Sequence, residues 1–282
     1  MTESRILRTA CVQLNSRDDM AANLAQAARW VREAAERGAE LISLPEYCAL
    51  MDGRGRVMRA GAFREEAHPA LAAFRDLARE VGRTLHVGSL TVTAEDGRPA
   101  NRGFILLPDG TVAARYDKIN MFDLVLPDGR EAFESRSFAA GRHPVVAETP
   151  LARFGMTICY DLRFPQLFAT LAGMGAEVML IPAAILPATG GEHWHTILRT
   201  RAIDTGSFVV GAALCGQHGG DRRSLGHSLI VDPWGRILAE GGEEPGLVMA
   251  DLDLGMVARM RAANPWLRGN ATSGSVSAAA AG

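Results

Sequence analysis

Residues 155–165 read GMTICYDLRFP, and the prediction of the fold starts from them. The residues directly before Cys159 are apolar or β-branched, and they predict a strand that ends at Cys159. Pro165 predicts the first position of a helix, where the N–H that proline lacks would have no partner. Cys159 is therefore expected at a sharp turn, with backbone N–H groups nearby that can hold a developing anion. A free cysteine can equally be a small buried hydrophobe, so this interpretation needs support from the rest of the chain.

The amino-terminal region predicts the kind of sheet that holds this turn. Residues 6–14 and 39–44 are expected to form two buried strands. Asp18 or Asp19 can cap the helix predicted between them, in which apolar residues recur up to Ala35 and which Gly38 ends. A strand–helix–strand unit implies a partly parallel sheet that is covered by helices.

Two more ionisable residues follow predicted strands, as Cys159 does. Glu46 comes directly after the second strand, and Lys118 follows a strand predicted over residues 111–116. Open α/β sheets place their chemistry at the carboxyl ends of strands. Taken singly, Glu46 is more readily explained as an exposed loop glutamate and Lys118 as a solvated edge charge. If these strands belong to one bundle, Glu46, Lys118 and Cys159 converge.

A converged set of these three groups has the components of nucleophilic catalysis. A cysteine thiol has a pKa of about 8.5, so a nucleophilic cysteine needs a base or a neighbouring cation at neutral pH. Glu46 can take the thiol proton and later give it to the leaving group. Lys118 would favour negative charge on the sulfur and on the carbonyl oxygen under attack.

The rest of the chain predicts a single domain over residues 1–270, without short repeats or an obvious linker. Residues 123–141 have a loop-like composition, and the Ser-, Ala- and Gly-rich residues 271–282 are expected to be a disordered tail. Helices are predicted over residues 64–81, from 165 onward, and over 192–204. The further predicted strands are 84–93, 101–107, 145–147, 153–158, 178–181, 208–214, 226–231, 237–240 and 247–251.

Composition narrows the class of protein. An apolar content of 48% and a charged content of 22% are those of an ordinary globular protein. A net charge of −2 points neither to nucleic acid nor to an anionic membrane. The chain has no apolar run long enough for a membrane span, and residues 1–5 lack a signal-peptide core, so we expect a cytoplasmic protein. The four cysteines are far apart in sequence and are expected to be reduced.

Three segments together resemble the signatures of the nitrilase, or carbon–nitrogen hydrolase, superfamily. They are Leu44-Pro45-Glu46, Tyr116-Asp117-Lys118-Ile119 and residues 159–165. The resemblance runs from about residue 6 to residue 264. It implies an α/β fold, a four-layer αββα sandwich, with Glu46, Lys118 and Cys159 as the catalytic triad.

The same resemblance implies further site residues. Glu134 corresponds to the second glutamate of the superfamily and would orient Lys118 by a charge-assisted hydrogen bond. The backbone N–H of Tyr160 would complete an oxyanion hole with Lys118. A homodimer or a higher homo-oligomer is also implied.

The residues after the nucleophile resemble those of one branch of the superfamily, the Nit-type amidases. Residues 215–218, together with Arg223-Ser224, are most similar to the deaminated-glutathione amidase group. Two residues depart from the pattern: Asn120 stands where these proteins usually have histidine, and His195 where a glutamate commonly follows His-Trp.

These observations lead to one expected function and two alternatives. We expect a cofactor-free amidase that hydrolyses a small carboxylated amide, of the deaminated-glutathione or ω-amide type, through a thioester on Cys159, releasing ammonia. Arg163 and Arg223, with Arg222 beside it, are the candidates for holding the substrate carboxylate, since the planar guanidinium fits that group. The alternatives are a nitrile or N-carbamoyl hydrolase of the same superfamily and a non-catalytic binding or scaffold protein.

A metal site is not expected. His193 and His195 could be considered a zinc pair, but His-x-His is a ligand spacing of strands, and this segment is predicted to be helical. No third ligand is evident from the sequence.

Overall fold

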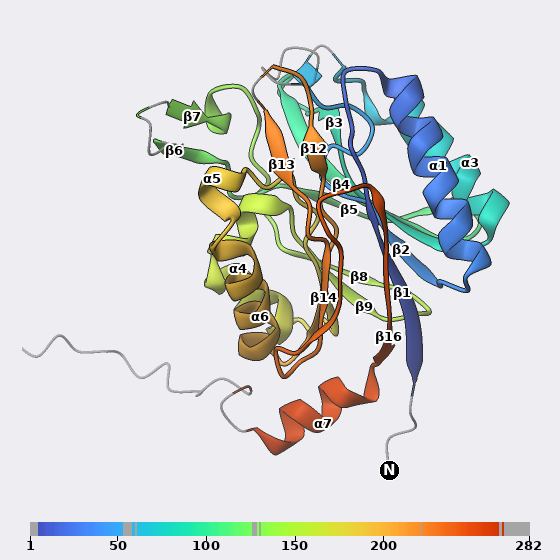
Figure 1. The fold of residues 1–282 in the computed structure, drawn as a ribbon, viewed down its shortest axis with the longest axis vertical. Coiled ribbons are helices and arrows are strands. Elements are labelled where there is room, and N and C mark those ends of the chain that lie inside the picture. The colour runs from blue at the N-terminus through green and yellow to red at the C-terminus, as the bar shows by residue number, and fades with distance from the viewer. Residues whose placement is uncertain are drawn as a thin grey trace, which may run out of the picture.

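Two six-stranded sheets lie face to face at the centre of the molecule, and helices cover their outer faces (Figure 1). The computed structural model describes residues 5–52, 58–59, 61–125, 129, 131–220, 222–264 and 267. The strand order is β16-β1-β2-β3-β4-β5 in the first sheet and β15-β14-β11-β10-β9-β8 in the second. The predicted four-layer αββα sandwich is therefore confirmed.

The centre of each sheet is parallel and its edges are antiparallel: β1, β2 and β3 run parallel in the first sheet, as do β9, β10 and β11 in the second. The strands of the first sheet are β1 (Ile6–Gln13), β2 (Leu41–Ser43), β3 (Thr84–Thr93), β4 (Pro99–Leu106), β5 (Val112–Asp117) and β16 (Gly246–Asp253). Those of the second are β8 (Val145–Glu148), β9 (Arg153–Met156), β10 (Val178–Leu180), β11 (Phe208–Gly211), β14 (Leu229–Val231) and β15 (Ile237–Glu240).

Each sheet carries its own pair of helices. Helices α1 (Met20–Glu36) and α3 (Pro69–Val81) contact the first sheet, and α4 (Pro165–Gly173) and α6 (His193–Thr205) contact the second. The predicted cap of α1 is present, because the Asp19 carboxylate accepts a hydrogen bond from Ala22 N at 3.1 Å. The remaining described helices are α5 (Pro187–Gly190) and α7 (Gly255–Ala263).

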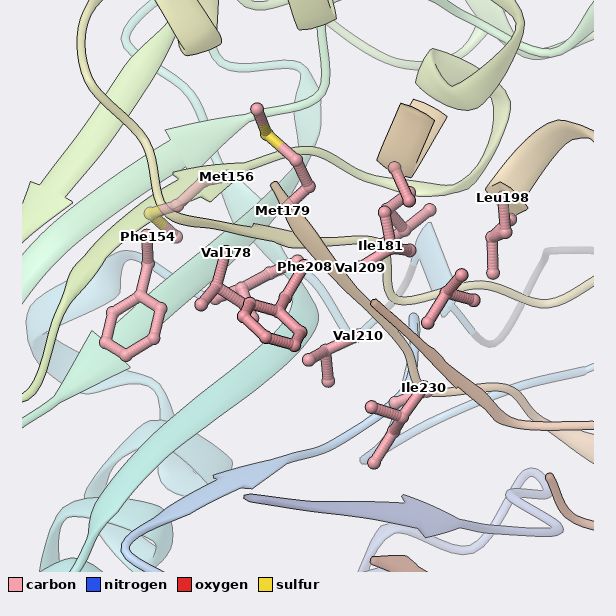
Figure 2. Close-up of a cluster of buried hydrophobic side chains, with 14 of the residues drawn as sticks. Phe154, Met156, Val178, Met179, Ile181, Leu198, Phe208, Val209, Val210 and Ile230 are labelled. Carbon is pink, nitrogen blue, oxygen red and sulfur yellow. The ribbon is translucent and has the colours of Figure 1, made fainter. Parts of the chain in front are cut away.

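A continuous layer of buried apolar side chains joins the sheets and the helices of the second half. Figure 2 shows part of it, with Phe154, Val178 and Val209 from neighbouring strands and, on the side of the cluster away from Phe154, Leu198 of α6. The same cluster includes Leu7 from the first sheet, so the core continues from one sheet to the other. Apolar burial of this kind supplies most of the favourable free energy of folding.

Several elements differ from the sequence prediction. The helix expected from residue 64 begins at Pro69, because proline suits the first helical position and residues 65–67 form a separate 3-10 turn. The loop-like residues 123–141 contain a short hairpin of β6 (Asp123–Val125) and β7 (Glu131–Phe133). A second hairpin of β12 (Cys215–Gln217) and β13 (Arg223–Leu225), as well as α7, was not predicted. The expected tail, residues 271–282, lies outside the described residues.

Gly88 allows the first sheet to approach the second beneath the candidate site. It lies in β3 where the pairing with β4 shifts register between Val87 and Leu90. A Cβ atom here would collide with the backbone oxygens of Leu44 and Pro45, which follow β2 of the same sheet, and with Pro182 Cβ, which follows β10 of the second sheet. Only glycine leaves room for that contact.

Gly88→Ala is expected to lower the free energy of unfolding by about 3 kcal/mol or more. The added methyl group would clash with backbone atoms, which can move only together with the chain segment that contains them. Urea unfolding followed by circular dichroism measures it. Gly173→Ala is the matched control, since a Cβ at that end of α4 meets nothing within 4 Å apart from its chain neighbours and the helix's own backbone. Equal stabilities for the two variants would contradict the argument.

No helix in the described ranges is long and apolar enough to span a membrane.

Candidate active site

Cys159 lies at the sharp turn predicted from the sequence. It opens a 3-10 helix, Cys159–Arg163, after β9, and Pro165 occupies the first turn of α4. Its φ of 47° is in the left-handed region, which is unfavourable for a residue with a side chain. The Cys159 N–H donates to the carbonyl of Pro182 at 2.8 Å, so the turn is held against the chain that follows β10.

The Asp161 carboxylate holds this turn in place by accepting hydrogen bonds. One carboxylate oxygen accepts hydrogen bonds from Ile158 N at 2.9 Å and from the Tyr116 hydroxyl at 2.7 Å. The other accepts from the backbone N and the side-chain Nδ2 of Asn120 at 2.9 and 2.8 Å. Asp161 thus joins the Cys159 turn to the end of β5, and Asn120, a departure from the superfamily pattern, has a structural role as a donor to it.

The structure brings Glu46, Lys118 and Glu134 together in one buried cluster. Lys118 Nζ donates to Glu46 Oε1 at 3.2 Å and to Glu134 Oε2 at 2.8 Å. The side chains of Lys118 and Glu46 are only 2% and 3% exposed, so water screens this charge arrangement little. Glu46 also accepts from Asn101 Nδ2 at 2.9 Å and from Ala184 N at 3.0 Å, which leaves its carboxylate little freedom to turn.

Glu134 is itself held by three donors. Besides Lys118, the Tyr47 hydroxyl donates to it at 3.0 Å and Phe122 N at 2.8 Å. Tyr47 has a φ of 52°, a second strained backbone in the site. Burial alone would raise the pKa of the Glu134 carboxyl, but the Lys118 ammonium and these hydrogen bonds lower it.

The electrostatics of the cluster keep the lysine charged and the thiol protonated. Burial alone would lower the pKa of Lys118, but Glu134 and Glu46 outweigh it and raise that pKa. Burial raises the pKa of the Cys159 thiol, the Glu46 carboxylate raises it further, and Lys118 acts in the opposite direction. Cys159 therefore depends on a nearby proton acceptor to become a thiolate.

A cavity of about 560 Å³ opens above these groups. Glu46, Lys118, Glu134 and Cys159 all line it, although they come from four separate segments of the chain. Its size is in the range typical of small-molecule sites. The four residues expected from the sequence therefore share one cavity, which has room for a small substrate.

The chain also matches a known family model. Residues 8–262 match the model described as carbon-nitrogen hydrolase. The chain belongs to the carbon–nitrogen hydrolase family. It is an amide-hydrolysing enzyme of the nitrilase superfamily.

Relatives support this assignment. The chain is 38% identical over 244 residues to the deaminated glutathione amidase of Yersinia enterocolitica, with 86% of this chain and 84% of that protein covered. It is 34% identical over 267 residues to the deaminated glutathione amidase of a Synechocystis strain, covering 92% and 96%. Among solved structures, Saccharomyces cerevisiae Nit3, described as a member of branch 10 of the nitrilase superfamily, superposes with a TM-score of 0.83 at 28% identity, covering 93% and 95%.

Of the arginines proposed to hold a substrate carboxylate, this carbon–nitrogen hydrolase places Arg163 and Arg222 in the cavity lining. Arg163 already donates to the Thr189 carbonyl at 2.8 Å and contacts His193 Nδ1 at 3.2 Å. It thus braces the segment before α6, although it still faces the cavity.

The structure places Arg223 differently from Arg163 and Arg222. Arg223 does not line the cavity; its exposed side chain pairs with Glu243 at 2.5 Å on the surface. Arg222 lies before β13 and lines the cavity, whereas Arg223 is the first residue of that strand and is exposed. Arg222 Nε is buried and, among the described residues, has no hydrogen-bond partner. Arg222 is therefore better placed than Arg223 to meet a ligand.

Sequence reasoning missed several residues of the site in this hydrolase. Asn101, Tyr47 and the Ala184 N–H hold the two glutamates, and Arg59 adds a further cation to the cavity lining. Asn101 and Tyr47 had a signal, because each lies beside a predicted strand end. Ala184 contributes only its backbone, so no side-chain pattern could have indicated it.

Proposed function

We propose that Cys159 is the nucleophile of this amidase, with Glu46 as the general base and acid. The observation that carries this proposal is the buried Lys118 ammonium between Glu46 and Glu134 in a cavity that Cys159 also lines. The desolvation free energy of a buried ammonium group is too large unless nearby negative charge balances it or the reaction needs the positive charge. Glu134 orients Lys118 in this scheme.

The first half-reaction would form a thioester. Glu46 takes the proton from the Cys159 thiol as the sulfur attacks the amide carbonyl. The resulting oxyanion is stabilised by Lys118 Nζ and by the backbone N–H of Tyr160. Glu46 then gives its proton to the nitrogen, the carbon–nitrogen bond breaks, and ammonia leaves.

The second half-reaction would release the acid. Glu46 takes a proton from water, whose oxygen attacks the thioester carbonyl, and the same oxyanion site is used again. The carbon–sulfur bond breaks and the proton returns to sulfur. One water is consumed for each amide hydrolysed.

We also propose that the substrate is a small amide with a free carboxylate, of the deaminated-glutathione or ω-amide type. The names of the relatives support the amide, and Arg222, with Arg59, supports the carboxylate. Neither arginine forms an ion pair with a carboxylate in the part of the chain that the structure describes. A buried carboxylate needs such a donor, and arginine can bind it through two hydrogen bonds.

Hydrolysis of an ω-amide acid is expected to exceed that of its methyl ester by about tenfold or more in kcat/KM, since the ester loses the ion pair with arginine. Arg222→Gln should lower kcat/KM for the acid and leave the ester nearly unchanged. Arg223→Gln is the matched control, because its side chain lies outside the cavity. Ammonia release measures all rates.

Equal rates for acid and ester in the unaltered enzyme would exclude the carboxylate requirement. An enzyme that released ammonia from nitriles faster than from amides would favour the nitrile alternative. Absence of ammonia release from every compound would favour a binding role.

We propose that the enzyme is a single-domain, cytoplasmic homo-oligomer. Four free, buried cysteines suit a reducing compartment. Exposed apolar side chains on the second half, including Ile203, Trp234 and Ile237, offer surface that another copy could cover. Light scattering on the purified protein tests the oligomer, and a single mass equal to the monomer would refute it.

A further inference from the structure

Three side chains outside the cavity converge on a single point. His195 lies in the first turn of α6, His227 precedes β14, and Glu240 ends β15. Glu240 Oε1 is 2.7 Å from His195 Nε2 and 2.9 Å from His227 Nδ1. We name these residues the His195–His227–Glu240 cluster.

The cluster is held by the surrounding backbone. His227 has a φ of 54°, the left-handed region, and its carbonyl accepts a hydrogen bond from the buried Trp194 Nε1 at 2.7 Å. Its own N–H donates to the Gly242 carbonyl at 2.9 Å. The backbone carbonyl and N–H of His227 are therefore both hydrogen-bonded, and this fixes the position of the His227 imidazole. Ligands on rigid, supported elements are a requirement of a preformed metal site.

The donor set is one that divalent transition metals prefer. Two imidazole nitrogens and one carboxylate oxygen lie within 4.8 Å of one another, a His₂Glu arrangement. The three side chains are 33%, 29% and 35% exposed, so an ion can enter and retain a water ligand.

We propose that the His195–His227–Glu240 cluster binds a divalent metal ion of the zinc type, with water as the fourth ligand. Ligand atoms around a tetrahedral zinc ion lie about 3.3 Å apart, so the two nitrogens need to move away from the Glu240 oxygen by roughly half an ångström. To bind the metal, each neutral imidazole presents the lone pair of the nitrogen that faces Glu240, so its ring proton resides on the other nitrogen, and any further proton passes to solvent water.

The ion has a structural role. None of the three described residues lines the cavity, whereas their neighbours His193 and Trp194 do. An ion at the cluster ties the start of α6 to β15 and to the turn before β14. It therefore stabilises one wall of the cavity without touching Cys159.

Zinc titration of tag-free, chelator-treated enzyme tests the proposal. Zn²⁺ is expected to raise the melting temperature by several degrees once it exceeds the dissociation constant by about a hundredfold. His195→Gln and Glu240→Gln should each weaken zinc binding by roughly tenfold or more. His143→Gln is the matched control, because His143 is exposed and lies elsewhere in the chain. Basal ammonia release should be unchanged in all three variants.

Cobalt substitution locates the ion. Co²⁺ at the cluster should give visible d–d bands without the near-ultraviolet charge-transfer band of a thiolate ligand, and Cys159→Ala should leave the spectrum unchanged. The proposal is overturned if zinc shifts the unaltered enzyme and the two cluster variants equally. It is also overturned if zinc produces no shift, or if a thiolate band shows that the ion sits on Cys159.

Discussion

Replacing Cys159 by alanine is expected to reduce kcat by at least about 10⁴-fold, because no thioester can form without the sulfur. The fold should persist. Cys159 is a small side chain in the wall of an existing cavity, and alanine occupies the left-handed turn no worse than cysteine does. Ammonia release measures the rate, and thermal unfolding should show a change of only a few degrees.

Cys215→Ala is the control for this variant, since Cys215 is also buried and lies outside the cavity lining. It should retain normal turnover. Mass spectrometry of the unaltered enzyme mixed with substrate should detect an acyl adduct on Cys159 and on no other cysteine. Near-normal activity of Cys159→Ala would refute the thioester mechanism.

Lys118→Met is expected to lower kcat by about 10³-fold, through loss of the oxyanion partner and of the cation that balances two glutamates. It should also cost about 3–5 kcal/mol of stability, because Glu46 and Glu134 would be left buried without a countercharge. Urea unfolding at neutral pH measures the second effect. The stability loss should shrink as the pH falls and the two carboxyls become protonated, since a neutral carboxyl needs no cation.

Lys118→Arg separates charge from shape. Lys118 is the only lysine among the 30 lysines and arginines of the sequence, so this site holds an ammonium group whereas the other 29 of these side chains are guanidinium groups. Arginine keeps the charge but presents a planar fork that is larger than the site occupied by Lys118 Nζ. We expect most of the stability to return and little of the rate. Full activity of Lys118→Arg would show that only the charge matters.

The strand ends that carry the three proposed catalytic residues could be predicted because each of these strands is followed by a polar break in the sequence. Glu46, Lys118 and Cys159 all have this context, and the superfamily resemblance correctly implied the four-layer arrangement. The roles of the three residues stay predictions until the variants are measured. The fold was accessible because burial is encoded locally in the spacing of apolar residues.

Features that depend on which chain segments meet in space could not be predicted in this way. Nothing local distinguishes Arg222, in the cavity, from Arg223, on the surface. In the sequence His193 and His195 are the residues that could be considered a zinc pair, but the structure groups His195 with two residues more than thirty positions away, His227 and Glu240. The strands of the hairpin β6–β7 have three residues each and leave too short a pattern to recognise.

The division of the site between the two sheets has a consequence for refolding. Glu46 and Lys118 follow strands of the first sheet and Cys159 follows a strand of the second, while the Ala184 N–H bonds Glu46 across the interface. Contacts between residues so distant in sequence form late, because the chain must close large loops first. Recovery of ammonia release after dilution from urea should therefore lag behind recovery of secondary structure. The recovery of turnover during refolding therefore reports when the two sheets dock.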